Sequence, residues 1–282
     1  MQRARVLLTL LLGACLLAPA VAQQRQPPPP YRILVSNDDG VRAPGLAALA
    51  QVLQAIGEVT IVAPAENQSG KGHSIIISEP IFRDDLTLPN GMKAIGLTAT
   101  PVTTMSVALR NILTPKPDLV VAGINRGLNM GFDGYLSGTV GVAREAAMQG
   151  VPAIASSIAE AGVPRDLVYA AEEVLGVARR VKQWGLPPYT FLNVSMSAMP
   201  SGGYKGYRVT TQAVAPGGNT SFGETKHPGS GRTIYWNVYK EGADAPEGTD
   251  IWAVNNGYVA VTPMKVGESD VPQGETIKGW FK

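Results

Sequence analysis

Short apolar runs recur along the first two thirds of the chain, and segments with helical spacing separate them. The runs are RILVS, VTIVAP, DLVVAG, PAIASS and TFLNVSM, at residues 32–36, 59–64, 118–123, 152–157 and 190–196. Continuous hydrophobicity of this kind is typical of strands that are buried on both faces of a sheet. Helices are expected near residues 44–56, 101–113, 139–149 and 166–182. The alternation predicts an α/β fold, a Rossmann-like three-layer domain with a mainly parallel sheet.

The chain changes character after about residue 200. Strand-like pieces at 204–216, 232–240 and 256–263 are separated by turns that are rich in Gly, Pro and Asn. We therefore expect an α/β core over residues 31–200. Residues 201–282 are expected to form a β-rich C-terminal extension, which supplies an arm for oligomerisation and then returns to the core.

The N-terminus has the layout of an export signal. Basic residues precede an apolar run at 6–17, and small residues end at Ala22. This pattern predicts a secretory signal peptide over residues 1–22 that is cleaved after Ala22, and therefore a periplasmic protein. The apolar run is too short to cross a bilayer comfortably, so no membrane span is expected after processing. A buried N-terminal helix and a lipoprotein attached at Cys15 are the two alternatives.

Residues 23–30, QQRQPPPP, predict a stiff Pro-rich linker before the domain. The composition then excludes several classes of function. The formal net charge is only +2, with no block of like charges, so no nucleic-acid polymer is expected as a partner. Cys15 is the single cysteine, which excludes disulfides, thiolate chemistry and cysteine-based zinc sites in the processed chain. The two histidines, His73 and His227, do not form a zinc-binding pattern.

Two adjacent carboxylates, Asp38 and Asp39, come directly after the first predicted strand. An Asx turn or helix N-cap explains one such residue, but two in a low-dielectric crevice repel each other unless a cation lies beside them. The carboxyl ends of parallel strands bring their loops together, so Ser69 and Asn125 from neighbouring loops could complete an oxygen-only set. Such a set suits Mg²⁺. The residues alone leave the metal site and the structural turn as open alternatives.

The segment YLSGTVG places Ser137, Gly138 and Thr139 at the start of a predicted helix. A serine there is a common N-cap, and the free N–H groups of a helix start also bind phosphate. An anion-binding helix end opposite a cation held by carboxylates is typical of a site that transfers or hydrolyses phosphate esters. The glycine-rich GINRGLNMG does not have the spacing of a dinucleotide fingerprint or a P-loop, and a serine-hydrolase nucleophile elbow is missing as well.

Three other side chains have open interpretations. His73 follows Ser69 closely enough in sequence to contact the site, whereas His227 lies in a polar loop and is expected in solvent. Arg126 is a candidate partner for phosphate, and an ordinary surface position is the alternative.

Five segments together resemble a known family. They are ILVSNDDGVRAPG, IVAPAENQSG, PDLVVAGINRGLNMG, YLSGTVGVAREA and PEGTDIWAVNNGYVAVTP. Their order is that of the SurE family of stationary-phase survival proteins, and the resemblance covers roughly residues 32 to 265.

The resemblance implies a function. It implies a 5′-nucleotidase that hydrolyses nucleoside 5′- and 3′-monophosphates with a divalent cation, Mg²⁺ or Mn²⁺. It also implies catalytic roles for Asp38 and Asp39, and a metal site made of Asp38, Asp39, Ser69 and Asn125. The implied contacts with phosphate or substrate are Asn37, Gly40, Asn129, Ser137, Gly138 and Thr139. Family members form dimers or tetramers through an exchanged C-terminal arm, so a homodimer or homotetramer is expected.

The chain departs from the family pattern in a few places. Thr103 or Thr104 stands where relatives usually carry an Asp, and the acidic segment before SGT keeps only Asp133. Export is also less usual for this family. The alternatives to nucleotide hydrolysis are a broad-specificity phosphatase or exopolyphosphatase, and an exported module that binds nucleotide or phosphate without turnover.

Overall fold

The computed structural model describes residues 29–159, 164–241 and 244–267, together with 269, 277, 278 and 280. The expected signal peptide and nearly all of the expected linker therefore lie outside the described residues. In the part of the chain that is described, no helix has the length and hydrophobicity needed to cross a membrane.

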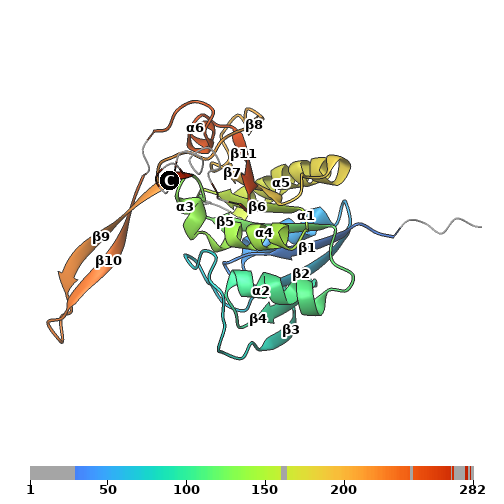
Figure 1. Cartoon of the computed structure of the whole chain (residues 1–282), viewed down its shortest axis with the longest axis horizontal. Coiled ribbons are helices and arrows are strands. Elements are labelled where there is room, and N and C mark those ends of the chain that lie inside the picture. The colour runs from blue at the N-terminus through green and yellow to red at the C-terminus, as the bar shows by residue number, and fades with distance from the viewer. Residues whose placement is uncertain are drawn as a thin grey trace, which may run out of the picture.

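One mixed sheet of nine strands runs through the described chain in the order β3-β4-β2-β1-β5-β6-β7-β11-β8 (Figure 1). The strands are β1 (Arg32–Ser36), β2 (Glu58–Pro64), β3 (Arg83–Thr87), β4 (Lys93–Leu97), β5 (Leu119–Arg126), β6 (Ala153–Ile158), β7 (Thr190–Met196), β8 (Tyr207–Val209) and β11 (Val259–Lys265). The central strands from β4 to β7 pair in parallel, whereas β3 and β11 run antiparallel to β4 and β7. The predicted α/β fold with a mainly parallel sheet is confirmed.

Helices cover both faces of this sheet (Figure 1). On one face lie α1 (Pro44–Leu53) and α5 (Pro164–Trp184), which pack against each other. On the other lie α2 (Pro101–Val107), its π-helical continuation η1 (Ala108–Ile112), and α4 (Gly138–Met148). The apolar side chains of α1 recur at helical spacing and are buried. Each such burial stabilises the fold by roughly 1.5–3 kcal/mol.

A two-stranded hairpin leaves the body of the molecule (Figure 1). Its strands, β9 (Gly218–Lys226) and β10 (Thr233–Glu241), pair only with each other among the described strands. The chain then returns through the short helix α6 (Asp250–Asn255) to β11, which pairs with β7 and β8 in the main sheet. The β-rich C-terminal part predicted from the sequence is confirmed.

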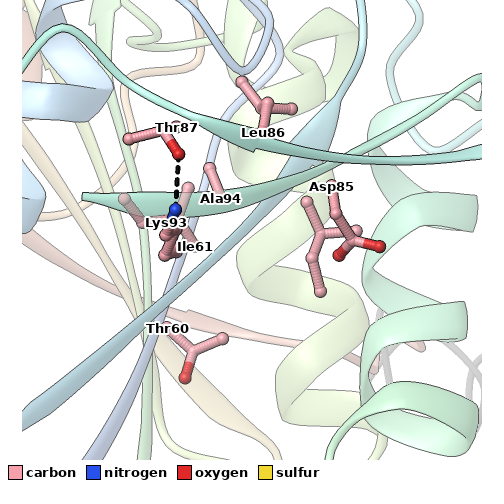
Figure 2. Close-up of a pocket in the computed structure, with 8 residues that line it drawn as sticks. Thr60, Ile61, Asp85, Leu86, Thr87, Lys93 and Ala94 are labelled. Atoms are coloured by element: carbon pink, nitrogen blue, oxygen red, sulfur yellow. Dashed lines mark hydrogen bonds between the residues drawn. The ribbon is translucent and has the colours of Figure 1, made fainter. Parts of the chain in front are cut away.

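Strands β3 and β4 were not predicted. Strand β3 has the sequence RDDLT and its charged side chains are exposed, as is common for an edge strand. Such a strand lacks the apolar run that marks a buried one. A pocket of about 410 Å³ lies against this edge. Figure 2 shows two of its lining residues, Lys93 of β4 and Thr87 of β3, joined by a hydrogen bond, in which Nζ lies 2.7 Å from Oγ1. No residue of the predicted site lines this pocket.

Candidate active site

Three predicted loops meet at the carboxyl ends of β2, β1 and β5, which are neighbours in the sheet. The backbone N–H of Gln68 donates to the carbonyl of Asp38 at 2.7 Å, and that of Val41 donates to the carbonyl of Pro64 at 2.7 Å. The loop that carries Ser69 therefore lies directly against the loop that carries the paired carboxylates. This convergence is the arrangement that the sequence predicted.

Gly40 allows the two loops to approach. Its φ is +102°, and a Cβ built there would lie 3.1 Å from the carbonyl carbon of Glu66. Asn37 closes the same turn, because its Nδ2 donates to the carbonyl of Gly40 at 3.0 Å. Both residues were predicted as contacts to phosphate or substrate, and the structure shows that both also shape the turn.

Asp38 is buried against the start of α4. Its carboxylate accepts hydrogen bonds from the hydroxyl of Thr139 and from the backbone N–H groups of Gly138 and Thr139. A Cβ on Gly138 would lie only 2.7 Å from Asp38 Cβ and 2.8 Å from Pro101 Cγ, so a glycine is needed at this contact. The helix start was predicted to bind phosphate, and in this structure its donors bond the carboxylate of Asp38.

The hydroxyls of Ser137 and Thr139 in the SGT segment make different hydrogen bonds. Ser137 is the N-cap of α4, and its Oγ accepts from the backbone N–H of Val140 at 3.1 Å. Thr139 donates to Asp38. The sequence predicted both residues as contacts to phosphate or substrate, and the structure shows each bonded within the protein.

Both carboxylates have raised pKa values. Burial raises the pKa of Asp38, and hydrogen bonds led by that from Thr139 oppose this increase. Burial and the charge of Asp38 raise the pKa of Asp39 to about 6, against the lowering effect of the N–H group and charge of Arg126. Arg126, a candidate for binding phosphate, therefore lies beside Asp39. A cation next to this pair would favour the charged form of both carboxylates.

The other predicted ligands fit a hard divalent cation. Asn125 donates its Nδ2 to the carbonyl of Gly127 at 2.6 Å, which leaves the amide oxygen for a cation. Asn37 Oδ1 is buried and has no hydrogen-bond partner in the described chain. Ser69 is exposed, directly after Gln68. In the described ranges no three His, Cys, Asp or Glu residues cluster as a metal site, so any site here mixes carboxylate, amide and hydroxyl oxygens, which are ligands that Mg²⁺ accepts.

Asn129 lies in the buried segment between β5 and the short helix α3 (Asp133–Leu136). Its backbone N–H donates to Ser157 Oγ at 3.2 Å, and its backbone carbonyl accepts from Asn193 Nδ2 at 2.7 Å. The sequence reasoning missed Ser157 and Asn193. A polar residue inside the apolar run TFLNVSM was the only available signal for Asn193.

His73 contacts α4. Its Nε2 lies 3.5 Å from Glu145 Oε2, and the neighbouring Gly72 donates its N–H to the carbonyl of Leu136 at 2.9 Å. These contacts hold the end of the Ser69 loop against α3 and α4. His227 lies in the exposed turn of the β9–β10 hairpin, where its Nδ1 accepts from the N–H of Ser230 at 3.1 Å.

Thr103 and Thr104 stand where the family usually has an acidic residue. Thr103 Oγ1 accepts from the backbone N–H of Ile76 at 2.8 Å, so it fixes the chain that follows the Ser69 loop. Thr104 is fully buried, and its hydroxyl has no partner in the described residues. Asp133 accepts from the N–H of Gly218 at 2.6 Å and thereby joins α3 to the base of the hairpin.

Comparisons with known proteins agree with this architecture. Residues 33–217 match the family model described as survival protein SurE. The 5′-nucleotidase SurE of Syntrophotalea carbinolica is 38% identical over 253 residues, which cover 88% of this chain and 96% of that protein. The 5′-nucleotidase SurE 1 of Thermus thermophilus is 39% identical over 237 residues, covering 83% and 92%. The crystal structure of SurE from Aquifex aeolicus superimposes with a TM-score of 0.76 at 34% identity, covering 89% of this chain and all of that one.

Proposed function

The chain belongs to the SurE family, and we propose that it is a metal-dependent nucleotidase. It hydrolyses nucleoside 5′-monophosphates, and also 3′-monophosphates, to nucleoside and phosphate. The observation that carries the proposal is the pair of adjacent carboxylates, buried Asp38 and partly exposed Asp39, which lies with other oxygen ligands at the carboxyl ends of neighbouring strands. The similarity to 5′-nucleotidases over most of the chain supports the same reaction.

Asp38, Asp39, Ser69 and Asn125 would hold the cation, Mg²⁺ or Mn²⁺. A bound cation of this kind polarises the phosphoryl group and lowers the pKa of a water. Asp38 is immobilised by α4 and presents its carboxylate in a fixed place. Asp39 is less buried, and in the metal-free protein burial and the charge of Asp38 raise its pKa to about 6, so a bound cation would favour its charged form.

The decisive experiment measures phosphate release from AMP with Mg²⁺ or Mn²⁺. EDTA should abolish the activity and added metal should restore it. Asp38→Asn should lower kcat/KM by at least about 100-fold, since even residues that only support metal ligands cost about 10- to 100-fold. Asp85→Asn is the matched control, because Asp85 is an exposed aspartate on β3 that pairs with Arg83. Activity without metal, or full activity of Asp38→Asn, would contradict the proposed mechanism.

A substrate panel tests the alternative functions. Faster hydrolysis of short polyphosphate or of unrelated phosphate esters than of AMP would indicate a broad-specificity phosphatase or exopolyphosphatase. Metal-dependent binding of AMP without phosphate release would indicate a module that only binds nucleotide or phosphate.

We further propose that the β9–β10 hairpin joins copies of this chain into a homodimer or homotetramer. Phe222, Tyr235 and Trp236 are each more than 60% exposed on it. An isolated two-stranded hairpin is only marginally stable in water, so a surface that covers these rings supplies the burial that the hairpin lacks within one chain. The molar mass measured by light scattering tests this proposal.

Export to the periplasm, with cleavage after Ala22, is also proposed from the sequence of the N-terminus. The N-terminal residue of the protein recovered from the periplasm should be Gln23. An N-terminus at Met1 in that fraction contradicts cleavage, and a lipid on Cys15 identifies the lipoprotein alternative.

A further inference from the structure

We infer that Asn193 and Ser157 are positioning residues for hydrolysis, because together they fix the backbone of Asn129 and so aim its side-chain amide at the substrate phosphate. The inference rests on the proposed function and extends it to two residues that contact neither metal nor substrate. It begins from the hydrogen bonds of the segment that follows β5.

The backbone of Asn129 is held from two directions. Its N–H donates to Ser157 Oγ on β6 at 3.2 Å, and its carbonyl accepts from Asn193 Nδ2 on β7 at 2.7 Å. The three residues are at least nine-tenths buried, with exposed fractions of 8% for Asn129, 0% for Ser157 and 4% for Asn193. Buried side chains that bond a loop backbone restrict its position much more than solvent-exposed contacts do.

The sheet register places the side chains of Ser157 and Asn193 next to the same segment, the one that contains Asn129. Strands β6 and β7 are parallel neighbours, with Ala155 opposite Asn193 and Ser157 opposite Ser195. Residues two apart on a strand point to the same face, so Ser157 and Asn193 project from the same face of the sheet. Ser157 Oγ also lies 3.1 Å from Ser195 Oγ, which fixes the serine hydroxyl in turn.

The same segment is held again two residues later. The N–H of Gly131 donates to Asp250 Oδ2 at 3.0 Å, and its carbonyl accepts from Gln212 Nε2 at 2.6 Å. Residues 129–131 are therefore fixed at both ends by side chains from four different parts of the chain. These four hydrogen bonds restrict the segment to one backbone conformation.

The side chain of Asn129 is left with unused hydrogen-bonding capacity. Its Nδ2 is buried and has no partner in the part of the chain that the structure describes. Buried polar atoms without partners are rare in folded proteins, and each one indicates a ligand, a water or a functional role. Asn129 lies along the chain between Asn125 and the SGT segment at the start of α4, two predicted parts of the site. An amide N–H donor in this place suits a phosphate oxygen.

A double-mutant cycle separates positioning from plain structural support. Asn129→Ala should lower kcat/KM for AMP by about 10- to 100-fold, as expected for a lost hydrogen bond to a charged group. Asn193→Ala should lower it by about 10-fold in the wild-type background and by less than about twofold in the Asn129→Ala background. The reason is that Asn193 acts only through Asn129. Ser157→Ala should follow the same pattern with a smaller effect.

Thr262→Val is the matched control. Thr262 pairs with Asn193 in the sheet, and its buried hydroxyl bonds Thr210 Oγ1 at 2.8 Å rather than the backbone of the 129–131 segment. Its loss should lower the melting temperature by an amount similar to that of Asn193→Ala, but leave kcat/KM within about twofold. Equal losses of activity in Asn193→Ala and Thr262→Val would overturn the inference. So would an effect of Asn193→Ala that is unchanged in the Asn129→Ala background.

The cycle is repeated with the affinity of the Mg²⁺-loaded protein for inorganic phosphate, measured by calorimetry. If the wild type releases no phosphate from AMP, the proposed function fails, and the calorimetric cycle alone then decides whether Asn193 acts through Asn129. The same non-additive pattern in phosphate affinity supports the inference. Identical phosphate affinities in the wild type, Asn129→Ala and Asn193→Ala contradict it.

Discussion

The surroundings of Asp38 and the β9–β10 hairpin are opposite extremes of the molecule. Asp38 is 3% exposed, and its carboxylate accepts several hydrogen bonds from α4. Trp236 on the hairpin is 62% exposed, and its strand pairs only with β9 among the described strands. Around Asp38 the chain itself supplies nearly all contacts, and what it leaves uncompensated is the negative charge of two adjacent carboxylates. On the hairpin, what the chain leaves uncovered is the apolar surface of exposed aromatic side chains.

This difference indicates what each region requires from outside the chain. Burial raises the pKa of Asp38, and burial together with the charge of Asp38 raises that of Asp39, so the proposed cation would favour the charged form of both. The exposed aromatic rings on the isolated hairpin leave apolar area that the proposed contact with a second copy of the chain would cover. The requirement for a cation is electrostatic and local, whereas the requirement for a covering surface depends on how much apolar area is exposed. Changes in the two regions should therefore affect different measurements.

The largest effect is expected from Gly138→Ala. The new Cβ would lie 2.7 Å from Asp38 Cβ and 2.9 Å from Asp38 Oδ2, so the carboxylate must shift. Displacing a catalytic group by about 1 Å costs on the order of 100-fold in rate, and we expect at least that loss in kcat/KM for AMP. Overpacking should also lower the free energy of unfolding by about 1–3 kcal/mol.

Gly202→Ala is the control for this substitution, because nothing lies within 4 Å of a Cβ at Gly202. Its activity should stay within about twofold of the wild type. If Gly138→Ala behaves like Gly202→Ala in both assays, the tight contact between α4 and Asp38 is not required.

A smaller effect is expected from Asp39→Asn in the metal-free protein, and it should depend on pH. The folded-state pKa of Asp39 is raised from 3.8 to about 6. Between these values the folded state binds more protons than the unfolded state, so this group destabilises the fold progressively as pH rises through that range. The substitution should therefore stabilise the protein by about 2 kcal/mol above pH 6, after a reduction for partial exposure, and hardly at all near pH 4.

Urea unfolding in EDTA at several pH values measures this difference. The stabilisation should shrink when the wild type is saturated with Mg²⁺, since binding to the folded state stabilises it. A constant difference between the two proteins from pH 4 to pH 8 would show that Asp39 has no raised pKa.

The smallest effect on folding is expected on the hairpin, where Phe222→Ser is combined with Trp236→Ser. Both rings are more than 60% exposed, so the free energy of unfolding of one chain should change by less than about 0.5 kcal/mol. Their loss should instead reduce the molar mass to that of a monomer. Trp184→Ser removes an even more exposed ring at the end of α5 and should leave the mass unchanged. An unchanged mass in the double variant would exclude these rings from the subunit interface.

Much of the fold could be predicted because its signals are local. The strands later identified as β1, β2, β5, β6 and β7 each contain a continuous apolar run, and a buried parallel strand requires one. Strand β3 escaped prediction because an edge strand with exposed charges needs no such run, and β4 because its five residues, KAIGL, form only a short one. The position of β4 depends on its pairing with β2, a long-range contact, and β3 in turn pairs with β4.

The residues of the candidate site fall into the same two groups, those indicated by local sequence signals and those that depend on long-range contacts. Asp38, Asp39, Ser69 and Asn125 could be named from the sequence because strand order in a parallel sheet brings loop ends together. That Thr103 anchors the chain near Ile76 could not be predicted, because it depends on a hydrogen bond across the fold. The same holds for the contacts that Asn193 and Ser157 make with Asn129.

The layers of the fold could be read from the sequence because the periodicity of strands and helices is local, and the ordered motifs indicated the family and the oxygen ligands expected at the strand ends. Only the tertiary structure decided which donors are already bonded and which are left free. It showed that Asp38 occupies the start of α4, and that Asn129 is held from β6 and β7. The physical reason is that hydrogen-bond partners are set by distances between residues far apart in the chain, and local sequence patterns carry no information about those distances.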